Sequence, residues 1–487
     1  MQAQPILKNL QPSQVFAYFE EICQIPHGSY HIDEISDYLV SFAKKQGLSY
    51  VQDEEKNVVI YCPATPGYEA EETIILQAHM DMVAVAEAGT AIDMEKDALR
   101  LVVEDDVVYA KGTSLGADDG IGVAMIMAIL SDDTLEHPAL EALITTNEEV
   151  GMEGARGLSA NLLHGHRLIN VDSEEEGILT VGCAGGQRVE AFLQGALEDN
   201  TGVTLDLEIS GLLGGHSGTM IHTGRANANV LAGCFVELLA KFCDARFVSL
   251  SGGEKCNAIC SETLLKMAIP EAMLTKASNT VKHIFHQMCA HYKDIDPGLS
   301  LRGEVSKENA PLCFDKVSTE RVARLIQDMP DGVVAMMEGQ EDLVETSLNL
   351  GVARMETEDT LHTFYELRSN KADALASLSE KVETIARDRG CEVVKDAGYP
   401  GWEFQPDSPL RDKMVKCFLE QYGVLPKVDV VHAGLECGLL STKIKNLDAV
   451  SLGPDMENIH TAAEKLHVSS VERVYKYLRS VLSTKDN

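Results

Sequence analysis

The chain has 487 residues, of which 45% are hydrophobic, and its 76 acidic residues against 41 basic ones give a formal net charge of −35. This length and hydrophobic content predict a full core in two domains or one large split domain, and they exclude a disordered chain. Because nucleic acids and anionic membranes bind positively charged surfaces, the acidic balance argues against either as a partner. Most of the charge serves solubility, and it is compatible with cationic substrates or divalent metals.

The N-terminal sequence and the cysteines point to the cytoplasm. The first residues, MQAQPILKNLQPSQ, show no basic stretch followed by an apolar one, so no secretory signal is expected. The longest apolar run, Ile121 to Leu130, is too short to span a bilayer. The twelve cysteines have no paired spacing, and the closest pair is Cys256-x3-Cys260. We therefore expect reduced thiols in a cytoplasmic protein.

The first elements lead to a short buried strand. Gln14 to Phe42 predicts two helices broken at Pro26-His27-Gly28-Ser29, and Tyr50 to Tyr61 predicts a hairpin that turns at Lys56-Asn57. Thr73 to Leu76 then reads TIIL, an apolar and β-branched run typical of a strand covered on both faces.

His79 and Asp81 follow the carboxyl end of this strand, where open α/β sheets bind their ligands. Residues two apart in an extended segment project to the same side, so one can bind a metal while the other orients it. Taken alone, a structural turn is the commoner explanation for such a pair. Similar groups after other strands favour a metal site.

A glycine-rich segment follows an alternating stretch, Leu99 to Tyr109, that predicts an exposed strand. It leads into a buried helix over Ile121 to Leu130, so Asp118 and Asp119 lie at or just before the helix N-terminus. Aspartate there often caps the free N–H groups. One aspartate is enough for capping, and the second is then available to a site. From this pair alone, capping and metal binding are equally good explanations.

Carboxylates and a histidine also follow the later strands. Leu140 to Thr146 ends at Glu148 and Glu149, and adjacent carboxylates repel unless they are solvated or bind a cation. Arg167 to Val171 ends at Asp172, and Asp448 to Leu452 leads through Gly453-Pro454 to His460. In a parallel sheet these ends share one edge. Imidazoles and carboxylates together suit Zn²⁺, Mn²⁺ or Co²⁺, and their number favours two metals with a bridging carboxylate.

From about residue 186 the pattern changes to alternating strands and amphipathic helices, in two similar sets, which predicts an inserted α+β domain. Ala397-Gly-Tyr-Pro-Gly-Trp resembles a linker back to the first domain. The predicted fold class is α/β: a split catalytic domain, residues 1–185 and 400–487, with a mainly parallel central sheet flanked by helices, and an inserted α+β lid domain, residues 186–399.

Eight short stretches, each weak alone, resemble one family when taken together and in order. They are Leu76-Gln-Ala-His-Met-Asp-Met-Val, Gly112-Thr-Ser-Leu-Gly-Ala-Asp, Glu148-Glu149, Asp172-Ser-Glu-Glu-Glu-Gly-Ile, Gly182-Cys-Ala-Gly-Gly, Gly214-Gly-His-Ser-Gly, Tyr399-Pro-Gly-Trp and His432-Ala-Gly-Leu-Glu-Cys-Gly-Leu. Over nearly the whole chain, the sequence resembles the M20 (aminoacylase/carboxypeptidase-like) co-catalytic metallopeptidases, and among them the dipeptidases.

The resemblance implies a ligand set for two metals. His79 and Asp172 would hold one ion, Glu149 and His460 the other, and Asp118 would bridge them.

The resemblance also implies roles beside the metals. Asp81 would orient His79, Glu148 would be the general base, and the peptide bond from Asp118 to Asp119 would be cis. Asp119 itself departs from the family, where asparagine is more usual, as does Cys256 in place of a basic residue.

The loop before His460 also does not match the family. His467 is therefore a competitor for the role of His460.

The resemblance further implies substrate contacts, with His216 on the lid. His216 would donate to the oxyanion, reaching across a dimer into the partner's site. Arg368 would bind the substrate's carboxylate with its planar fork, and Asn257 would line the same pocket. Gly434 and Glu436 would line the amino end of the substrate.

The implied function is hydrolysis of dipeptides, including Xaa-His dipeptides, by a metal-bridged water with Glu148 as base. The cofactors would be two divalent ions per subunit, zinc being expected and manganese or cobalt the alternatives. A homodimer through the lid is expected, with no nucleic acid or membrane partner. An N-acyl-amino-acid deacylase of the same superfamily is the main alternative, and a non-catalytic metal-binding protein is the third.

Overall fold

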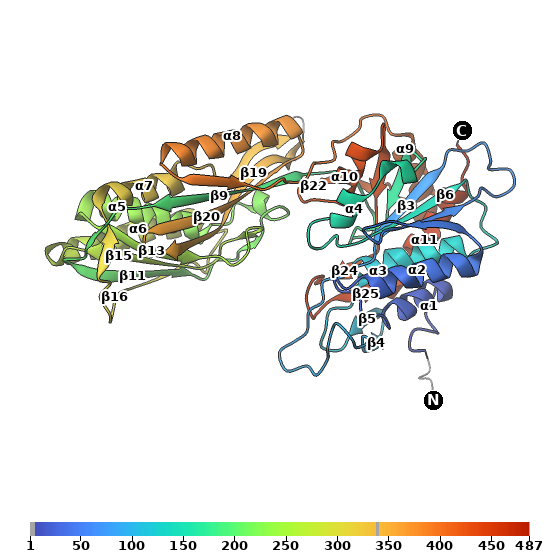
Figure 1. Ribbon diagram of the computed structural model, residues 1–487, viewed down its shortest axis with the longest axis horizontal. Helices are drawn as coiled ribbons and strands as arrows, with labels where there is room; N and C mark the ends of the chain where they lie inside the picture. Colours follow the sequence, from blue (N-terminus) through green and yellow to red (C-terminus); the bar gives the residue numbers. More distant parts are fainter. Residues whose placement is uncertain (1–4, 338–339, 487) are drawn as a thin grey trace. The chain divides into compact units, whose positions relative to one another are not determined.

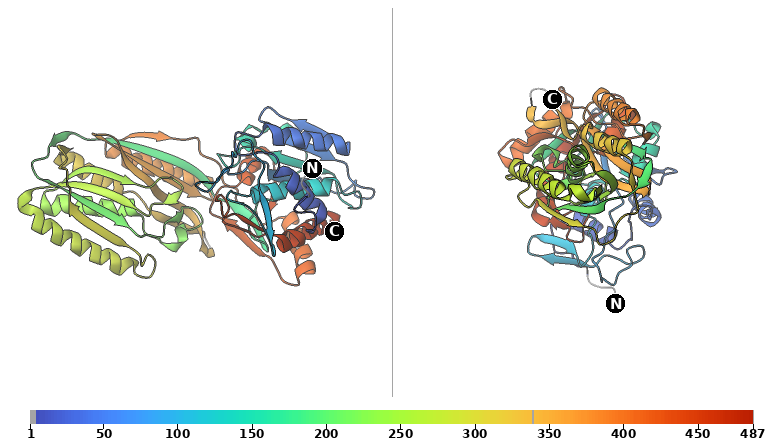
Figure 2. Two further views of the ribbon diagram at one scale, coloured as in Figure 1. Left: turned by 90° about the horizontal axis from the view of Figure 1, so that it is seen from below. Right: turned by 90° about the vertical axis from the view of Figure 1, so that its left-hand side faces the viewer.

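The computed structural model describes residues 5–337 and 340–486, and these form two compact units (Figure 1). Unit 1 comprises Met1–Gly182, Phe404–Val430 and Leu435–Asn487, and unit 2 comprises Cys183–Glu403 and Val431–Gly434. The first and last described residues both belong to unit 1 (Figure 2). The sequence-based boundaries, after residues 185 and 399, did not include the short return of residues 431–434 to unit 2.

Unit 1 is built on a mixed sheet. Eight strands of the described chain form it, in the order β1-β2-β6-β3-β7-β23-β8-β22. Their bounds are β1 Ser49–Gln52, β2 Val58–Cys62, β3 Ile74–His79, β6 Leu140–Thr145, β7 Arg167–Asn170, β8 Ile178–Cys183, β22 Lys427–Val431 and β23 Asp448–Ser451. The middle strands β6, β3, β7 and β23 are parallel, whereas β1–β2, β2–β6 and β23–β8 are antiparallel pairs. The predicted parallel centre is therefore confirmed, and so is the hairpin at Tyr50 to Tyr61.

The helices of unit 1 pack around this sheet. They are α1 Ser13–Ile22, α2 Asp33–Gln46, α3 Ala117–Leu130, α4 Glu153–Gly157, α9 Pro409–Tyr422, α10 Glu436–Lys443 and α11 Val468–Ser483. All 14 residues of α3 are buried, because it packs between β3 and α1. A helix that is apolar on every side has to be buried in this way. Figure 1 shows α1, α2 and α3 on the same side of the sheet.

One sequence expectation is wrong in this unit. Leu99 to Tyr109 was expected to form one exposed strand, but it forms the hairpin of β4 Leu101–Glu104 and β5 Val107–Ala110. Asp105 adopts a positive φ of 52°, which aspartate tolerates in a tight turn, and so the chain reverses between the strands. With β24 Met456–Glu457 and β25 Lys465–His467, the hairpin makes a small four-stranded sheet.

Unit 2 contains one large antiparallel sheet. Its nine strands in the described chain are β9 Gly185–Gln194, β11 Val203–Ser210, β13 Arg246–Gly252, β15 Thr263–Ile269, β16 Ser300–Val305, β18 Gly332–Met337, β19 Gln340–Thr357, β20 Thr360–Ser369 and β21 Glu392–Lys395. The order is β16-β11-β15-β13-β19-β20-β9-β21, with β18 paired to β19. The two similar sets expected from the sequence therefore contribute to a single sheet.

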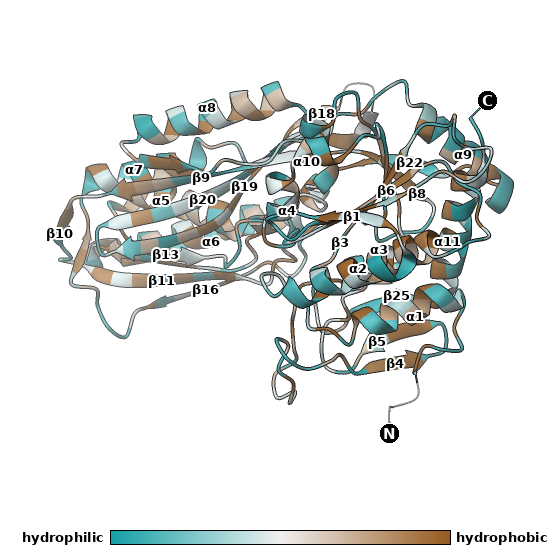
Figure 3. Ribbon diagram, turned by 45° about the vertical axis from the view of Figure 1, so that its right-hand side comes forward, coloured by the Kyte–Doolittle hydropathy of each residue, from teal (hydrophilic) through white to brown (hydrophobic). Residues whose placement is uncertain are grey.

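Four longer helices cover this sheet and close its core. They are α5 Ala228–Cys243, α6 Leu274–Tyr292, α7 Lys316–Gln327 and α8 Ala372–Asp388. α8 alternates between hydrophilic and hydrophobic colours along its length (Figure 3), and it buries Leu378, Val382 and Ala386 in the core. This alternation is the pattern of a helix that covers a sheet with one face and meets water with the other. The α+β class expected for this part of the chain is confirmed.

Neither long apolar helices nor disulfides are found in the part of the chain that the structure describes. None of its helices has the length and hydropathy needed to cross a membrane. All twelve cysteines are free thiols.

Near the carboxyl ends of the strands, the backbone packs so closely against Gly453 that no side chain fits there. A Cβ atom at this position would lie 1.5 Å from the carbonyl oxygen of Ser173, which follows Asp172. We expect Gly453→Ala to lower the free energy of unfolding by about 1–3 kcal/mol, because the backbone has to shift. Denaturant unfolding checks this. In the control Gly120→Ala, the nearest atom would be 3.4 Å away, on Phe19, so a similar loss there would contradict the steric explanation.

Candidate active site

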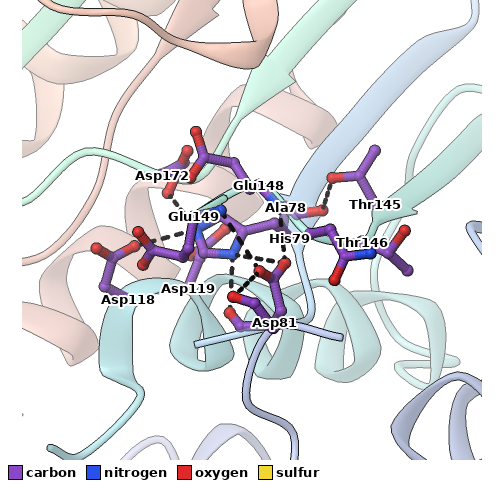
Figure 4. A network of polar contacts seen from close by, with 12 residues as sticks. Ala78, His79, Asp81, Asp118, Asp119, Thr145, Thr146, Glu148, Glu149 and Asp172 are labelled. Atoms are coloured by element: carbon purple, nitrogen blue, oxygen red, sulfur yellow. Dashed lines mark hydrogen bonds and ion pairs between the residues drawn. The ribbon is translucent and has the colours of Figure 1, made fainter. Parts of the chain in front are cut away.

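Side chains from four segments of unit 1 meet where the parallel strands end. His79 is the last residue of β3, Glu148 and Glu149 follow β6, and Asp172 follows β7. Because neighbouring parallel strands end at the same edge of the sheet, these groups lie together. Figure 4 shows Asp118, from the start of α3, and the carboxylates of Glu148, Glu149 and Asp172 gathered around His79.

Asp118 stands between two groups of possible metal ligands. His79, Asp118 and Asp172 form one group, and Asp118, Glu149 and His460 form the other. The Oδ1 atom of Asp118 lies 3.1 Å from Nε2 of His79, and its Oδ2 atom lies 2.9 Å from Nε2 of His460. One carboxylate thus offers one oxygen to each group, which is the arrangement of a bridging ligand.

The other members of the groups are equally close. Nε2 of His79 lies 3.3 Å from Oδ1 of Asp172, and Nε2 of His460 lies 2.9 Å from Oε1 of Glu149. A third possible group consists of His79, Glu148 and Glu149. The structure therefore brings together all the residues that the sequence analysis selected as ligands or base.

Asp81 contacts this cluster in two ways. The proton on Nδ1 of His79 is assigned by its 2.9 Å contact with the backbone carbonyl oxygen of Asp81, which leaves Nε2 facing the cluster. The carboxylate of Asp81 is 3.7 Å from the same nitrogen. It accepts instead from the N–H groups of Glu148 and Glu149 at 3.0 and 3.4 Å. Asp81 thus orients His79 mainly through its backbone, and its carboxylate holds the segment that carries Glu148.

The electrostatics of the cluster fit a bound cation. Burial by itself lowers the pKa of His460, but its hydrogen bonds to Asp118 and Glu149 raise this pKa to about 11. Burial by itself also lowers the pKa of His79. The charge of Asp172 and the hydrogen bond to Asp118 outweigh this effect and raise the pKa well above its usual value. Protons on the imidazoles compensate the crowded carboxylates. Divalent cations would supply that compensation, and carboxylate oxygens with imidazole nitrogens are ligands that Zn²⁺, Mn²⁺ and Co²⁺ accept.

Glu148 differs from the paired groups around it. Burial raises the pKa of Glu148 well above its usual value, and the charges of Asp172 and Glu149 act in the same direction. A carboxylate with increased proton affinity is suited to proton transfer near neutral pH.

The turn before α3 resolves the two explanations of the aspartate pair. The residue at the N-cap is Gly116, which has no side chain, and the peptide bond from Asp118 to Asp119 is cis. Asp119 accepts from the backbone N–H of His79 at 3.2 Å. Burial, followed by the charge of Asp172, raises the pKa of Asp119 well above its usual value, which favours its neutral form. Neither aspartate side chain caps the helix.

The two candidate histidines near the C-terminus are separated by the structure. His460 lies in the cluster, with a positive φ of 60° in the loop after β24. His467 lies at the end of β25 and pairs with Glu457 at 2.9 Å. The geometry therefore selects His460.

Four of the residues expected to contact substrate belong to unit 2: His216, Asn257, Arg368 and Gly434. His216, in β12 Gly215–His216, accepts the N–H groups of Gly218 and Thr219 on Nδ1, each at 3.2 Å. Asn257 directly precedes β14 Ala258–Ile259, which pairs with β12, and its carbonyl oxygen accepts from the N–H of Ser217. These two residues are therefore neighbours.

Arg368 and Gly434 meet at Tyr399 in the same unit. Arg368, on β20, is 4% exposed and donates from Nη1 to the hydroxyl of Tyr399 at 2.7 Å. A Cβ atom at Gly434 would lie 2.7 Å from the ring of Tyr399, so only glycine fits there. His432, which the sequence analysis did not select, is buried nearby. Burial, and then the positive charge of Arg368, lowers the pKa of His432 to about 3.

Glu436 was expected to line the substrate, but it is fully buried in unit 1. Its Oε2 atom accepts from Nε2 of Gln77 at 2.5 Å and from the hydroxyl of Thr145 at 2.6 Å. Gln77 lies two residues before His79 on β3, so Glu436 supports the sheet beneath the cluster. Its burial raises its pKa to about 8.

The chain matches the model of Peptidase family M20/M25/M40 over residues 75–484, and it belongs to this family. It is 34% identical over 493 aligned positions to the cytosol non-specific dipeptidase of Escherichia coli (strain K12), an alignment that covers 98% of each chain.

Solved structures agree with this membership. The crystal structure of aminoacylhistidine dipeptidase from Vibrio alginolyticus superposes with a TM-score of 0.88 at 34% identity, covering 98% of each chain. An aminopeptidase from Bacillus cereus has a TM-score of 0.62 at 17% identity, covering 97% of this chain and 98% of that one, and thus shares the fold.

Proposed function

We propose that the chain is a metal-dependent dipeptidase whose substrates include Xaa-His dipeptides. The observation that supports this most directly is the pair of ligand groups that share Asp118, with the buried carboxyl group of Glu148 beside them. The names of the two relatives at 34% identity support dipeptides as the substrate class.

In the proposed site, His79 and Asp172 would hold one divalent ion and Glu149 and His460 the other, with Asp118 contributing to both. Zinc is the proposed metal, with manganese and cobalt as alternatives that the same donors accept. When bound, two such ions lower the pKa of a shared water and polarise the carbonyl group of the peptide bond.

Glu148 is the proposed general base. Its carboxylate takes a proton from the attacking water and passes it to the leaving amine, so that the amine departs neutral. The Asp81 carboxylate, which accepts from the N–H groups of Glu148 and Glu149, holds this segment in place. His79 is held by the Asp81 carbonyl oxygen, which keeps its Nε2 atom directed at the cluster.

Residues of unit 2 are proposed to bind the substrate. His216 donates to the oxyanion, in the partner's site of a homodimer formed through this unit, and Asn257 and Gly434 line the pocket. Unit 2 would thus serve as lid and dimerisation domain, and unit 1 as catalytic domain. The twelve free cysteines and the cytosolic relative support a location in the cytoplasm.

Arg368 is the proposed partner of the substrate's carboxylate, because its planar fork suits a carboxylate and is only partly satisfied within the protein. Nη1 donates to Tyr399, Nη2 lies 3.5 Å from Oε1 of Glu366, and the buried Nε atom has no hydrogen-bond partner among the described residues. We expect Arg368→Ala to raise KM for Leu-Ala roughly ten- to a hundredfold, since a hydrogen bond to a charged group contributes about 1.5–3 kcal/mol. Steady-state kinetics check this. The C-terminal amide of Leu-Ala is the matched substrate, and an equal effect on both substrates would contradict a carboxylate contact.

The proposed function is tested by measuring hydrolysis of β-Ala-His, Gly-His, Leu-Ala and an N-acetyl amino acid by the zinc-, manganese- or cobalt-loaded protein. We expect the dipeptides to be cleaved faster than the acetylated substrate. Faster cleavage of the N-acetyl amino acid would make the protein a deacylase of the same superfamily. Full metal loading with no cleavage of any amide would leave a metal-binding protein without this activity.

A further inference from the structure

Glu464 makes an unusual set of contacts in unit 1. This side chain is 2% exposed, and its two carboxylate oxygens face the turn that precedes α3. Oε2 accepts from the backbone N–H groups of Leu115 and Gly116 at 2.6 and 3.0 Å. Oε1 accepts from those of Ala117 and Asp118 at 2.8 and 3.4 Å. One carboxylate therefore binds four consecutive N–H groups, and the last of them belongs to the bridging Asp118.

These N–H groups belong to the turn that leads into the regular part of α3. Leu115 precedes the helix, Gly116 at the N-cap has no side chain to offer, and the backbone at Asp118 and Asp119 is not helical. Burial raises the pKa of Glu464, and the hydrogen bonds from Leu115 and Gly116 oppose that rise. A residue distant in sequence thus satisfies the N–H donors of this turn.

Glu464 also belongs to the segment that carries His460. It lies four residues after His460, and its own backbone N–H donates to the carbonyl oxygen of Thr461. His460 in turn approaches Oδ2 of Asp118 at 2.9 Å. A single side chain therefore connects the backbone of Asp118 with the loop of His460, the two residues that share one of the ligand groups.

We propose that Glu464 is a positioning residue for the metal site, holding the turn of Asp118 and the loop of His460 at the separation at which both bind one ion. The proposal rests on the metal site of the proposed function. The competing explanation is a helix cap that contributes to folding alone. The two explanations differ in what they predict for metal affinity. Only a positioning role makes the spacing of the ligands, and therefore the affinity, depend on the Glu464 carboxylate.

Glu141 provides a matched control. It is also buried, at 4% exposure, and its carboxylate accepts from the backbone N–H groups of His164 and Gly165 at 2.9 to 3.0 Å. It lies near the start of β6, whereas the ligands follow the other end of that strand. Replacing it removes the same kind of interaction far from the metals.

The experiment measures Zn²⁺ and Co²⁺ binding to the metal-free protein, by competition with a chelating dye, in Glu464→Gln and Glu141→Gln. Glutamine has one acceptor oxygen, and its NH₂ group would face N–H donors. We expect Glu464→Gln to weaken binding of at least one ion by roughly 10- to 100-fold, the usual effect of losing a group that supports a ligand. Glu141→Gln is expected to stay within about twofold of the unmodified protein. The unfolding temperatures of both metal-free variants are also measured, to report the effect of each substitution on stability.

Equal metal affinities in Glu464→Gln and Glu141→Gln would overturn the proposal, whatever their unfolding temperatures. If Glu464→Gln does not fold, Glu464→Asp decides the question, because its carboxylate is shorter by one methylene and still charged. Unchanged affinity in that variant would equally overturn the proposal. Since metal binding is measured without peptide, the result stands even if no dipeptide is cleaved. Excess metal should restore hydrolysis by Glu464→Gln, which a lost base cannot do.

Discussion

Replacing Glu148 by glutamine is expected to lower kcat for dipeptide hydrolysis by roughly 10²- to 10⁴-fold, the range that a general base contributes. The amide cannot accept the proton of the attacking water, although it has nearly the same size as the carboxylate. The proposed ligands His79, Asp118, Glu149, Asp172 and His460 are unchanged, so two metals should still bind. Initial rates at saturating Leu-Ala, with metal content determined by elemental analysis, check both parts.

Glu153→Gln is the control for this experiment, because Glu153 lies in the same segment and is exposed. It should retain the activity of the unmodified protein. The assignment would be contradicted if Glu148→Gln hydrolysed Leu-Ala at an unchanged rate. It would also be contradicted if that variant lost both metals, because Glu148 would then be a ligand, as its presence in a third possible ligand group allows.

Replacing Asp118 by asparagine is expected to affect both metals at once. Its two oxygens face different groups, one toward His79 and the other toward His460. Asparagine keeps one oxygen and has no charge, so we expect metal affinity to fall by more than about 100-fold, beyond the effect of losing a supporting residue. Hydrolysis should fall with it. Stabilisation by metal, about 4 kcal/mol at a thousandfold excess over Kd, should fall to about 1.4 kcal/mol or less at that concentration.

Asp119→Asn provides the comparison next to it in the chain. The raised pKa of Asp119 favours its neutral form, and an amide oxygen can still accept from the N–H of His79. This variant should therefore bind two metals and remain active. Equilibrium dialysis and thermal unfolding with and without Zn²⁺ distinguish the variants. Two tightly bound ions in Asp118→Asn would contradict a bridging role.

The strands of unit 1 could be predicted from the sequence because their patterns are local. The apolar run at the start of β3 is typical of a strand covered on both faces, and all six residues of β3 are buried. The groups after its end and after β6 and β7 could then be placed together, because parallel strands share an edge. The sequence was therefore sufficient to predict that His79, Glu148, Glu149 and Asp172 lie together.

Other features depend on contacts between distant segments, which periodicity does not encode. Glu464 is one acidic residue in a polar stretch, yet it binds the turn of Asp118, 346 residues earlier. Glu436 was expected at the substrate, but it is buried beside Gln77 and Thr145. The β4–β5 hairpin was missed because its two-residue turn contains aspartates instead of glycine or proline. Choosing between His460 and His467 likewise required the position of the loop.

Two metal ions held around Asp118 are proposed to make this chain a peptidase for dipeptides. The most direct test is a titration of the metal-free protein with Zn²⁺, in which Leu-Ala hydrolysis and bound metal are followed together. We expect two ions to bind per chain and hydrolysis to reach its full rate as the second site fills. Hydrolysis at full rate without any bound metal, or two bound ions with no hydrolysis of any dipeptide, would contradict the account.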